Sequence, residues 1–230
     1  MKTQLVVLAF VIISVGIGCK KENACAHEEH IFNISSQTKE WLPDEILTEE
    51  IKFQSENGDI ITFQKDTTFH REYDWSFSTP CGNGNKRETI FYERIGHSYS
   101  LGDTVEILMS TNIVNTECGW GNVNEVKLME EVWVAVLKQR QNSPKLVDIG
   151  GLSIRTKLIN AEESEELCTK HYAKFNPVIE LNGVNYQNVY SDDRPGHENT
   201  EFPLAEIYFQ KGEGIIGYID EAGIKWRKIE

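Results

Sequence analysis

Short segments of alternating apolar and polar residues, separated by glycine-containing turns, recur along most of this chain of 230 residues. The clearest pair is 51–55 and 60–64, which flank the sequence Glu56-Asn57-Gly58-Asp59. A period of two is typical of a strand with one buried face, and Asn-Gly between two such segments is a strong hairpin signal. The pattern therefore predicts a mostly β fold with antiparallel pairing, because short turns join antiparallel neighbours.

The same pattern predicts further strands along the chain, with a second Asn-Gly hairpin turn at Asn182-Gly183. These strands are expected at 69–79, 88–95, 104–111, 123–137, 152–159, 178–181, 184–190, 205–210, 214–220 and 224–228. We expect them to form a meander within one β-rich domain that spans 41–230.

One helix is expected, from Asn160 to Asn176. Asn160 is a suitable N-cap, and Glu163 three residues later completes a capping-box pattern. Acidic residues fill the first turns and basic residues the last, as the helix dipole favours, and Pro177 then ends the helix. Cys168, Tyr172 and Phe175 would share one face of this helix.

The N-terminal sequence is typical of an export signal. A single basic residue, Lys2, precedes an uncharged and largely apolar run of about 14 residues from Leu5 to Gly18. At ~1.5 Å per residue this run is too short to cross a hydrocarbon core of ~30 Å. Residues 1–18 are therefore predicted to be a signal peptide.

The sequence Gly16-Ile17-Gly18-Cys19 resembles the signal of bacterial lipoproteins, in which a small residue precedes a cysteine that is acylated after cleavage. The resemblance implies lipidation of Cys19 and attachment to a membrane. Lys20-Lys21-Glu22 is similar to the start of outer-membrane or surface-exported lipoproteins of some Gram-negative bacteria. Residues 19–40 would then form a polar tether. The alternative is cleavage within Ala24-Cys25-Ala26, which would release a soluble secreted or periplasmic protein.

Four cysteines remain if Cys19 carries lipid, and an even number in an exported chain favours disulfides with three connectivities. Cys81 and Cys118 both lie in Cys-Gly-x-Gly sequences, so turns at the same end of neighbouring hairpins would bring them together. We therefore expect Cys81–Cys118 and, by elimination, Cys25–Cys168. Four buried free thiols are the alternative. A zinc site is disfavoured because no Cys-x-x-Cys pair occurs.

The segments 183–190, 207–218 and 223–226 resemble the closing strands of uncharacterised β-rich lipoproteins of bacteria, in which an aromatic pair, a Gly-x-Gly turn and a returning strand follow one another. Some domains of this kind are compared with curved half-barrel sheets that bind lipids or lipoproteins. The resemblance implies a curved sheet, a half-barrel or a barrel-like meander, and it carries no catalytic residues.

Several patterns that would carry chemistry have a simpler explanation here. Gly212–Gly217 matches Gly-x-Gly-x-x-Gly, but a strand pattern follows where a nucleotide site needs a helix, so no cofactor is expected. His27-Glu28-Glu29-His30 is the densest group of metal-ligand residue types, and we expect it to be a solvated part of the tether rather than a metal site. His97 and Ser98 are adjacent on a strand, so they point to opposite faces and cannot act as base and nucleophile.

Charge and aromatic content narrow the class of function. A net charge of −13 disfavours nucleic-acid binding, which needs basic surface. Trp120, in a predicted turn, and Tyr172 and Phe175 are the candidate ligand-binding residues. We expect a non-enzymatic, membrane-anchored envelope lipoprotein that binds a hydrophobic ligand or a protein partner. The alternatives are an envelope hydrolase with an acid/base pair not recognisable from sequence, and a purely structural surface lipoprotein.

Overall fold

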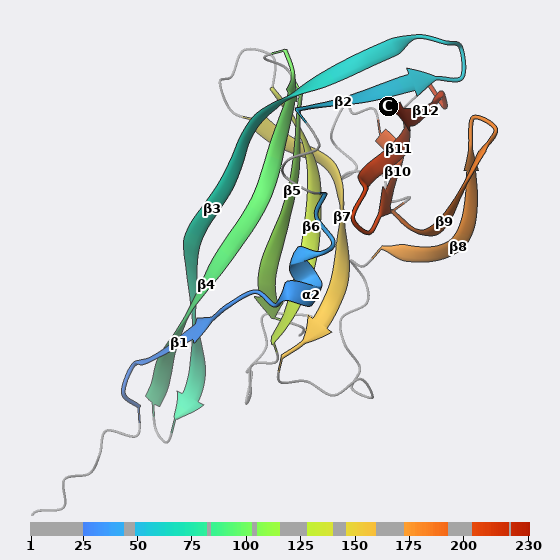
Figure 1. Ribbon diagram of the computed structural model, residues 1–230. Helices are drawn as coiled ribbons and strands as arrows, with labels where there is room; N and C mark the ends of the chain where they lie inside the picture. Colours follow the sequence, from blue (N-terminus) through green and yellow to red (C-terminus); the bar gives the residue numbers. More distant parts are fainter. Residues whose placement is uncertain are drawn as a thin grey trace, which may run out of the picture.

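A twelve-stranded sheet organises the described part of the chain, and the sheet curls into a half-barrel (Figure 1). This computed structural model describes residues 25–43, 49–81, 84–102, 105–115, 128–139, 146–159, 173–192, 204–220 and 222–230. The strands are β1 Glu28–Phe32, β2 Glu50–Ser55, β3 Ile60–Cys81, β4 Gly84–Leu101, β5 Val105–Asn115, β6 Leu128–Gln139, β7 Leu146–Leu158, β8 Lys174–Leu181, β9 Val184–Asp192, β10 Leu204–Gln210, β11 Gly214–Asp220 and β12 Lys225–Ile229. The helical turn α2 spans Ser36–Lys39.

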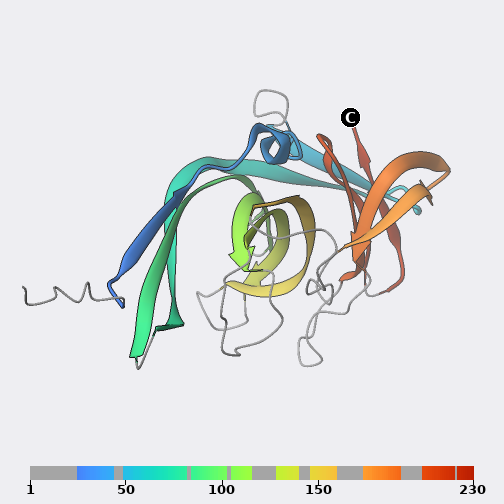
Figure 2. The same ribbon diagram turned by 90° about the horizontal axis from the view of Figure 1, so that it is seen from below.

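The strands pair in the order β7-β6-β5-β4-β3-β2-β12-β11-β10-β9-β8. All these pairs are antiparallel, as the sequence predicts, and only β1 pairs in parallel, with β4. Figure 2 shows the long strands β3 and β4 arching over β5–β7, which curl beneath them, while β8–β11 lie on the far side. The last strand of the chain, β12, lies between β2 and β11 and so joins the two halves of the sheet.

Glycine and asparagine turns define the hairpins at the predicted positions. Gly58, between β2 and β3, has φ +92°, and Asn182 and Gly183, between β8 and β9, have φ +49° and +78°. Positive φ at both central residues is the geometry that matches the twist of a two-residue hairpin. Gly212 and Gly214 likewise turn the chain between β10 and β11, which confirms the turn interpretation of that glycine motif.

The half-barrel encloses a core to which most strands contribute. Its largest fully buried side chains include Phe53, Tyr99, Met109 and Phe209, from β2, β4, β5 and β10. Trp41 and Leu42, which follow α2, pack into the same core. Side chains therefore fill the interior in the described part of the fold, as in other small barrels.

A bulge in β3 changes which face its side chains occupy. The register with β4 shifts between Lys65 and Thr67, so that Lys65 pairs with the core residue Tyr99 but Tyr73 pairs with Tyr92. One extra residue reverses the alternation, because successive side chains point to opposite faces. The odd-numbered residues of β3 beyond the bulge, from Phe69 onward, therefore lie on the other face of the sheet, where Tyr73, Trp75 and Phe77 pack against a second buried cluster that includes Ile90 and Tyr92.

Residues 28–39 form part of the fold, so the prediction that 19–40 is a polar tether is wrong for this segment. β1 adds to β4, and Ile34 and the side chain of Thr38 are buried. The buried carboxylate of Glu130 accepts hydrogen bonds from the Ser35 amide, the Ser35 hydroxyl and the Thr38 hydroxyl. A polar segment is held because these donors find a buried acceptor, which hydrophobicity alone does not reveal.

The predicted helix 160–176 is wrong at its C-terminal end. Lys174, Phe175 and Asn176 belong to β8, where they pair with β9. Residues 160–172 lie outside the described residues. Pro177 continues β8 rather than ending a helix, and it is tolerated because β8 is the last strand of the sheet and its outer edge needs no amide donor.

Candidate functional site

The sequence-predicted site residues fall into two groups. Cys19, Cys118, Trp120, Cys168 and Tyr172 lie outside the described residues, as does the signal peptide 1–18. Cys25, Cys81 and Phe175 are described.

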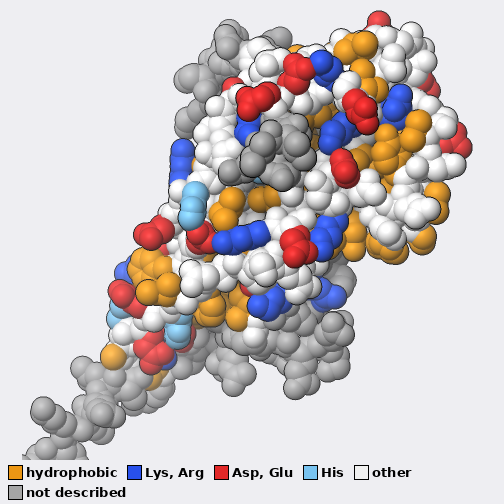
Figure 3. All heavy atoms as spheres, viewed as in Figure 1, with side chains coloured by type: hydrophobic (Ala, Val, Ile, Leu, Met, Phe, Trp, Pro, Cys, Tyr) orange, Lys and Arg blue, Asp and Glu red, His pale blue; other side chains and the backbone are white. Residues whose placement is uncertain are grey.

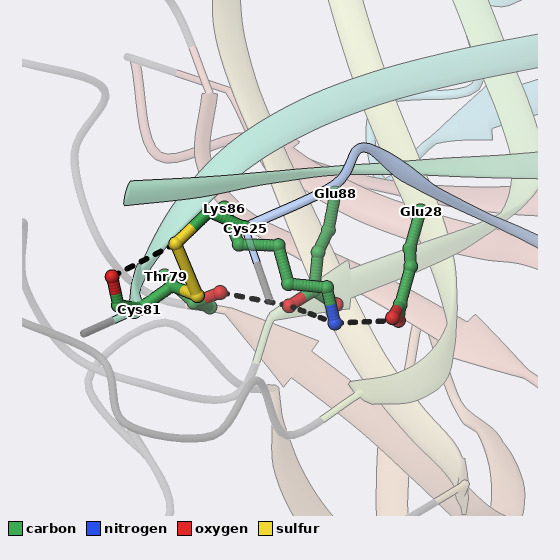
Figure 4. The surroundings of a disulfide bond; sticks show 6 residues. All are labelled: Cys25, Glu28, Thr79, Cys81, Lys86 and Glu88. Atoms are coloured by element: carbon green, nitrogen blue, oxygen red, sulfur yellow. Dashed lines mark hydrogen bonds and ion pairs between the residues drawn. A yellow bond between two sulfur atoms is a disulfide. The ribbon is translucent and has the colours of Figure 1, made fainter. Parts of the chain in front are cut away.

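Cys25 forms a disulfide with Cys81, with the two Cα atoms 5.5 Å apart (Figure 4). The predicted pairings Cys81–Cys118 and Cys25–Cys168 are therefore wrong. The parallel register of β1 on β4, with Glu28 opposite Glu88, brings the segment before β1 to the tip of the β3–β4 hairpin, where Cys81 lies. This pairing joins segments far apart in sequence, so a shared Cys-Gly-x-Gly context was not a sufficient guide.

Beside the disulfide, four side chains form an ion cluster: Glu28, His30, Lys86 and Glu88. His30 Nε2 lies 3.1 Å from Glu88 Oε2, and Lys86 Nζ contacts both carboxylates, at 2.5 Å from Glu28 and 3.6 Å from Glu88. The hydrogen bond from Lys86 holds the pKa of Glu28 below its ordinary value and raises that of Lys86 itself.

This ion cluster fits a metal ion poorly. One atom each of Glu28, His30 and Glu88 lies within 4.8 Å of the others, which is a suitable spacing for three ligands. However, the Lys86 ammonium already sits against both carboxylates, and a divalent cation would have to displace it. Figure 4 shows Lys86 reaching between Glu88 and Glu28. The cluster is better explained as the attachment of β1 to β4.

His97 and Ser98 point to opposite faces, as predicted. His97 is buried and its Nδ1 is hydrogen-bonded to the Thr68 hydroxyl, whereas the Ser98 hydroxyl donates to Glu106 at 2.6 Å. They do not form a base–nucleophile pair.

Phe175 is 49% exposed on the edge strand β8. Its ring packs 5.3 Å from that of Tyr190, which in turn packs 5.1 Å from Trp41. Phe175 is thus the outer member of a row of aromatic rings that leads to the core, and its role in ligand binding stays a prediction.

The described strands enclose a surface groove with a volume of about 1220 Å³, which we call the C-terminal groove. It lies among β2, β9–β12 and the chain end. Its lining residues are Glu49, Glu50, Lys52, Tyr186, Gln210, Glu213, Ile216, Arg227, Lys228, Ile229 and Glu230.

The β8–β9 hairpin forms one wall of the C-terminal groove because its tip is fastened to the sheet. The Asn182 side-chain amide donates to the carbonyl oxygens of Gln54 and Lys225, each at 3.2 Å. Leu181 and Ile216 are buried in a small apolar cluster between this hairpin and β10–β11, with Tyr186 packed against it. Tyr186, Ile216 and Ile229 therefore give the groove an apolar part, and its other lining residues are charged or polar.

Charges of both signs line the C-terminal groove. Lys52 is ion-paired with Glu50, and its hydrogen bond lowers the pKa of that carboxyl group. Lys228 donates to the Glu213 carbonyl oxygen at 2.8 Å. Figure 3 shows acidic, basic and apolar side chains intermixed over the C-terminal strands, at the upper right. A surface of this mixed kind suits a partner with both charges and apolar groups.

Arg227 supplies the unusual feature of the groove. Its Nε atom is buried and has no hydrogen-bond partner within the described part of the chain. A buried donor without an acceptor costs ~1–3 kcal/mol. An occupant that brings an acceptor would recover this cost if the Arg227 side chain turns toward the groove. Sequence reasoning missed the groove because its walls come from strands far apart along the chain.

Within the described residues, no helix is long and apolar enough to cross a membrane. No protein-family model, no curated protein and no solved structure matches this chain.

Proposed function

We propose that this protein is a lipid-anchored, non-enzymatic binding protein of the bacterial cell envelope, and that it holds a polypeptide segment of a partner in the C-terminal groove. The observation that carries the proposal is the groove itself, with a small apolar part, charges of both signs and the buried Nε of Arg227, which has no hydrogen-bond partner among the described residues. Membrane attachment rests on the lipoprotein-like signal that ends at Gly18-Cys19.

A surface site is favoured over an internal lipid site because core side chains occupy the inside of the half-barrel in the described part of the chain. A polypeptide fits the groove better than a lipid does. Backbone carbonyls provide acceptors for the guanidinium group of Arg227, and side chains of either sign complement the rim, whereas an acyl chain would provide no acceptor and would cover charged side chains with apolar groups.

Photo-crosslinking in the native host's cells tests the groove. A benzophenone amino acid at Tyr186, in the groove, is expected to give a discrete adduct with one protein. The matched control is the same residue at Val178, which is 57% exposed on β8 and outside the groove, and it should give none. The change Arg227→Gln should reduce the Tyr186 adduct at least tenfold. Equal labelling at both positions, or no effect of Arg227→Gln, would contradict the proposed partner site.

The anchor is tested separately by intact mass of the membrane-extracted protein. A mass that begins at Cys19 and includes acyl chains is expected, and Cys19→Ala should release the protein from the membrane. A chain that begins at His27 would refute the anchor without bearing on the groove.

A further inference from the structure

On the face opposite the core, Arg71 of β3 and Arg94 of β4 lie directly opposite each other. Cross-strand partners share a face of the sheet, and like charges in this arrangement are destabilising. The chain has 36 acidic and 23 basic residues, so carboxylates to neutralise the pair are abundant. Even so, neither of the two guanidinium groups forms an ion pair with a carboxylate of the described residues.

The next cross-strand pair along β3 and β4 also brings two like charges together, in this case two carboxylates. Glu72 lies opposite Glu93, on the other face of the sheet. There Lys39 Nζ lies 2.9 Å from Glu93, and His70 contacts Glu93 as well. The hydrogen bond from Lys39 holds the pKa of Glu93 below its ordinary value. The Glu72–Glu93 pair is thus compensated by the Lys39 ammonium. The Arg71–Arg94 pair has no carboxylate of the described residues in ion-pair contact, and the carboxylates of Glu106 and Glu131 act on it only from a longer distance.

Aromatic rings and a hydroxyl group, rather than a direct ion pair with a described residue, hold Arg94 in place. Its guanidinium carbon lies 5.2 Å from the ring centre of Tyr73 and 5.1 Å from that of Trp133. Its Nε and one Nη donate to the Ser110 hydroxyl at 3.1 and 2.8 Å. A guanidinium has five N–H donors, so part of its capacity is left for another acceptor. Arg71 lies over the Phe69 ring at 5.7 Å and is exposed.

A pocket of about 200 Å³ opens between these groups. Both arginines, the rings of Phe69 and Tyr73 and the Ser98–Glu106 pair line it. The β3 bulge at 65–67 places the arginine and the rings of β3 on this face, and bulges commonly re-aim side chains at functional sites. Two cations, two aromatic rings and one carboxylate acceptor complement a ligand that carries a negative group, a ring and hydroxyl donors.

From this geometry we infer that the Arg71–Arg94 pocket binds an acidic sugar unit, with its carboxylate between the two guanidinium groups, its ring against Phe69 and Tyr73, and a hydroxyl donating to Glu106. The pocket lies on β3–β5, apart from the C-terminal groove, so this inference holds whether or not the proposed partner site does.

The test is titration of the folded protein with D-glucuronate and with D-glucose, which share a ring and differ in the carboxylate. Binding is followed by the Nε–H resonance of Arg94 in two-dimensional NMR. Glucuronate is expected to bind at least tenfold more tightly than glucose, and high salt should weaken it. Equal affinity for the two sugars, or no movement of the Arg94 resonance, would overturn the inference.

Arg71→Gln is the informative variant because Arg71 is exposed and its loss leaves Arg94 in place. It should weaken glucuronate binding at least tenfold and, without ligand, raise the melting temperature, since it removes the like-charge repulsion. The matched control is Arg87→Gln, an exposed arginine of β4 that bonds Ser76 outside the pocket and should change neither property. Equal effects of the two variants on glucuronate binding would refute the site.

Discussion

Gly96 illustrates how a single missing side chain shapes this sheet. It lies opposite Phe69 on β3 and Ser110 on β5, and an added methyl group would lie 2.6 Å from the Phe69 ring and 2.7 Å from Ser110 Cβ. Gly96→Ala is expected to lower the free energy of unfolding by about 1–3 kcal/mol, because the methyl group would also lie 2.4 Å from the backbone carbonyl oxygen of Met109, so the β5 backbone as well as the ring must move. Gly84→Ala, where the nearest atoms are 3.9 and 4.0 Å away, is the control and should have little effect in urea unfolding. Equal stability of the two variants would contradict the role given to Gly96.

Glu131, on β6, should make stability depend on pH. It is buried, and burial raises the pKa of its carboxyl group above the ordinary 4.5, although Asn112 and Ser153 hydrogen-bond to it. The folded state therefore favours the protonated form of Glu131. The resulting contribution to the free energy of unfolding is fully present below about pH 4.5 and is lost as pH rises through the folded pKa. Glu131→Gln should gain stability relative to the parent from pH 4 to pH 8, measured by urea unfolding. Glu180→Gln, at an exposed position of β8, should show no such trend.

At the scale of elements, β1 depends on contacts at both of its ends. It lies on β4 in parallel, with the Cys25–Cys81 disulfide before it and the Ser35–Glu130 hydrogen bonds after it. β1 is five residues long, and the side chain of Ile31 is 80% exposed. Its own burial is therefore slight, and we expect the covalent link to maintain its pairing.

Replacing both Cys25 and Cys81 with serine tests this dependence. A link between residues 56 apart contributes about 4 kcal/mol in the chain-entropy model, and a measured loss of about 2–4 kcal/mol is expected. Hydrogen exchange should accelerate in 28–32 first and leave β10 and β11 protected. Reductant should reproduce the effect on the parent protein but not on the double variant. Unchanged exchange in β1 would show that the ion cluster alone holds it.

At the scale of the whole molecule, the C-terminal strand determines whether the sheet is continuous. β12 pairs with β11 on one side and with β2 on the other. It therefore connects strands β2–β7 with strands β8–β11 in one sheet. The Trp226 ring also stacks on Tyr218, and its indole N–H donates to Asp220 at 2.9 Å.

Deleting 225–230 should therefore divide the sheet. We expect the melting temperature to fall by more than 10 °C and the thermal transition to broaden, since the strands on either side of β12 lose their backbone partners. Deletion of Glu230 alone, which lies beyond β12, is the control. A single sharp transition at the parent temperature in the longer deletion would show that core packing alone joins the two halves.

The strands and turns were predictable because their signals are local. Alternation at 51–55 and Asn-Gly at 57–58 and 182–183 depend on neighbouring residues, and the structure confirms both hairpins. The prediction for Lys174–Asn176 was wrong because cap and charge signals favoured a helix, whereas pairing with β9 places these residues in a strand. Residues 28–39 were read as tether because their composition is polar, and their buried acceptor, Glu130, lies about 95 residues away.

The sequence by itself determined the β class, the antiparallel hairpins and the opposite orientation of His97 and Ser98, because backbone preference and a period of two act over a few residues. Only the tertiary structure decided the Cys25–Cys81 pairing, the assembly of the C-terminal groove and the placement of Arg71 opposite Arg94. Each depends on the register between distant segments, and a bulge of one residue at 65–67 reverses the face that a strand presents. Register between distant segments is a property of the packed sheet, since burial of a whole face selects it, and no local pattern of residues encodes it.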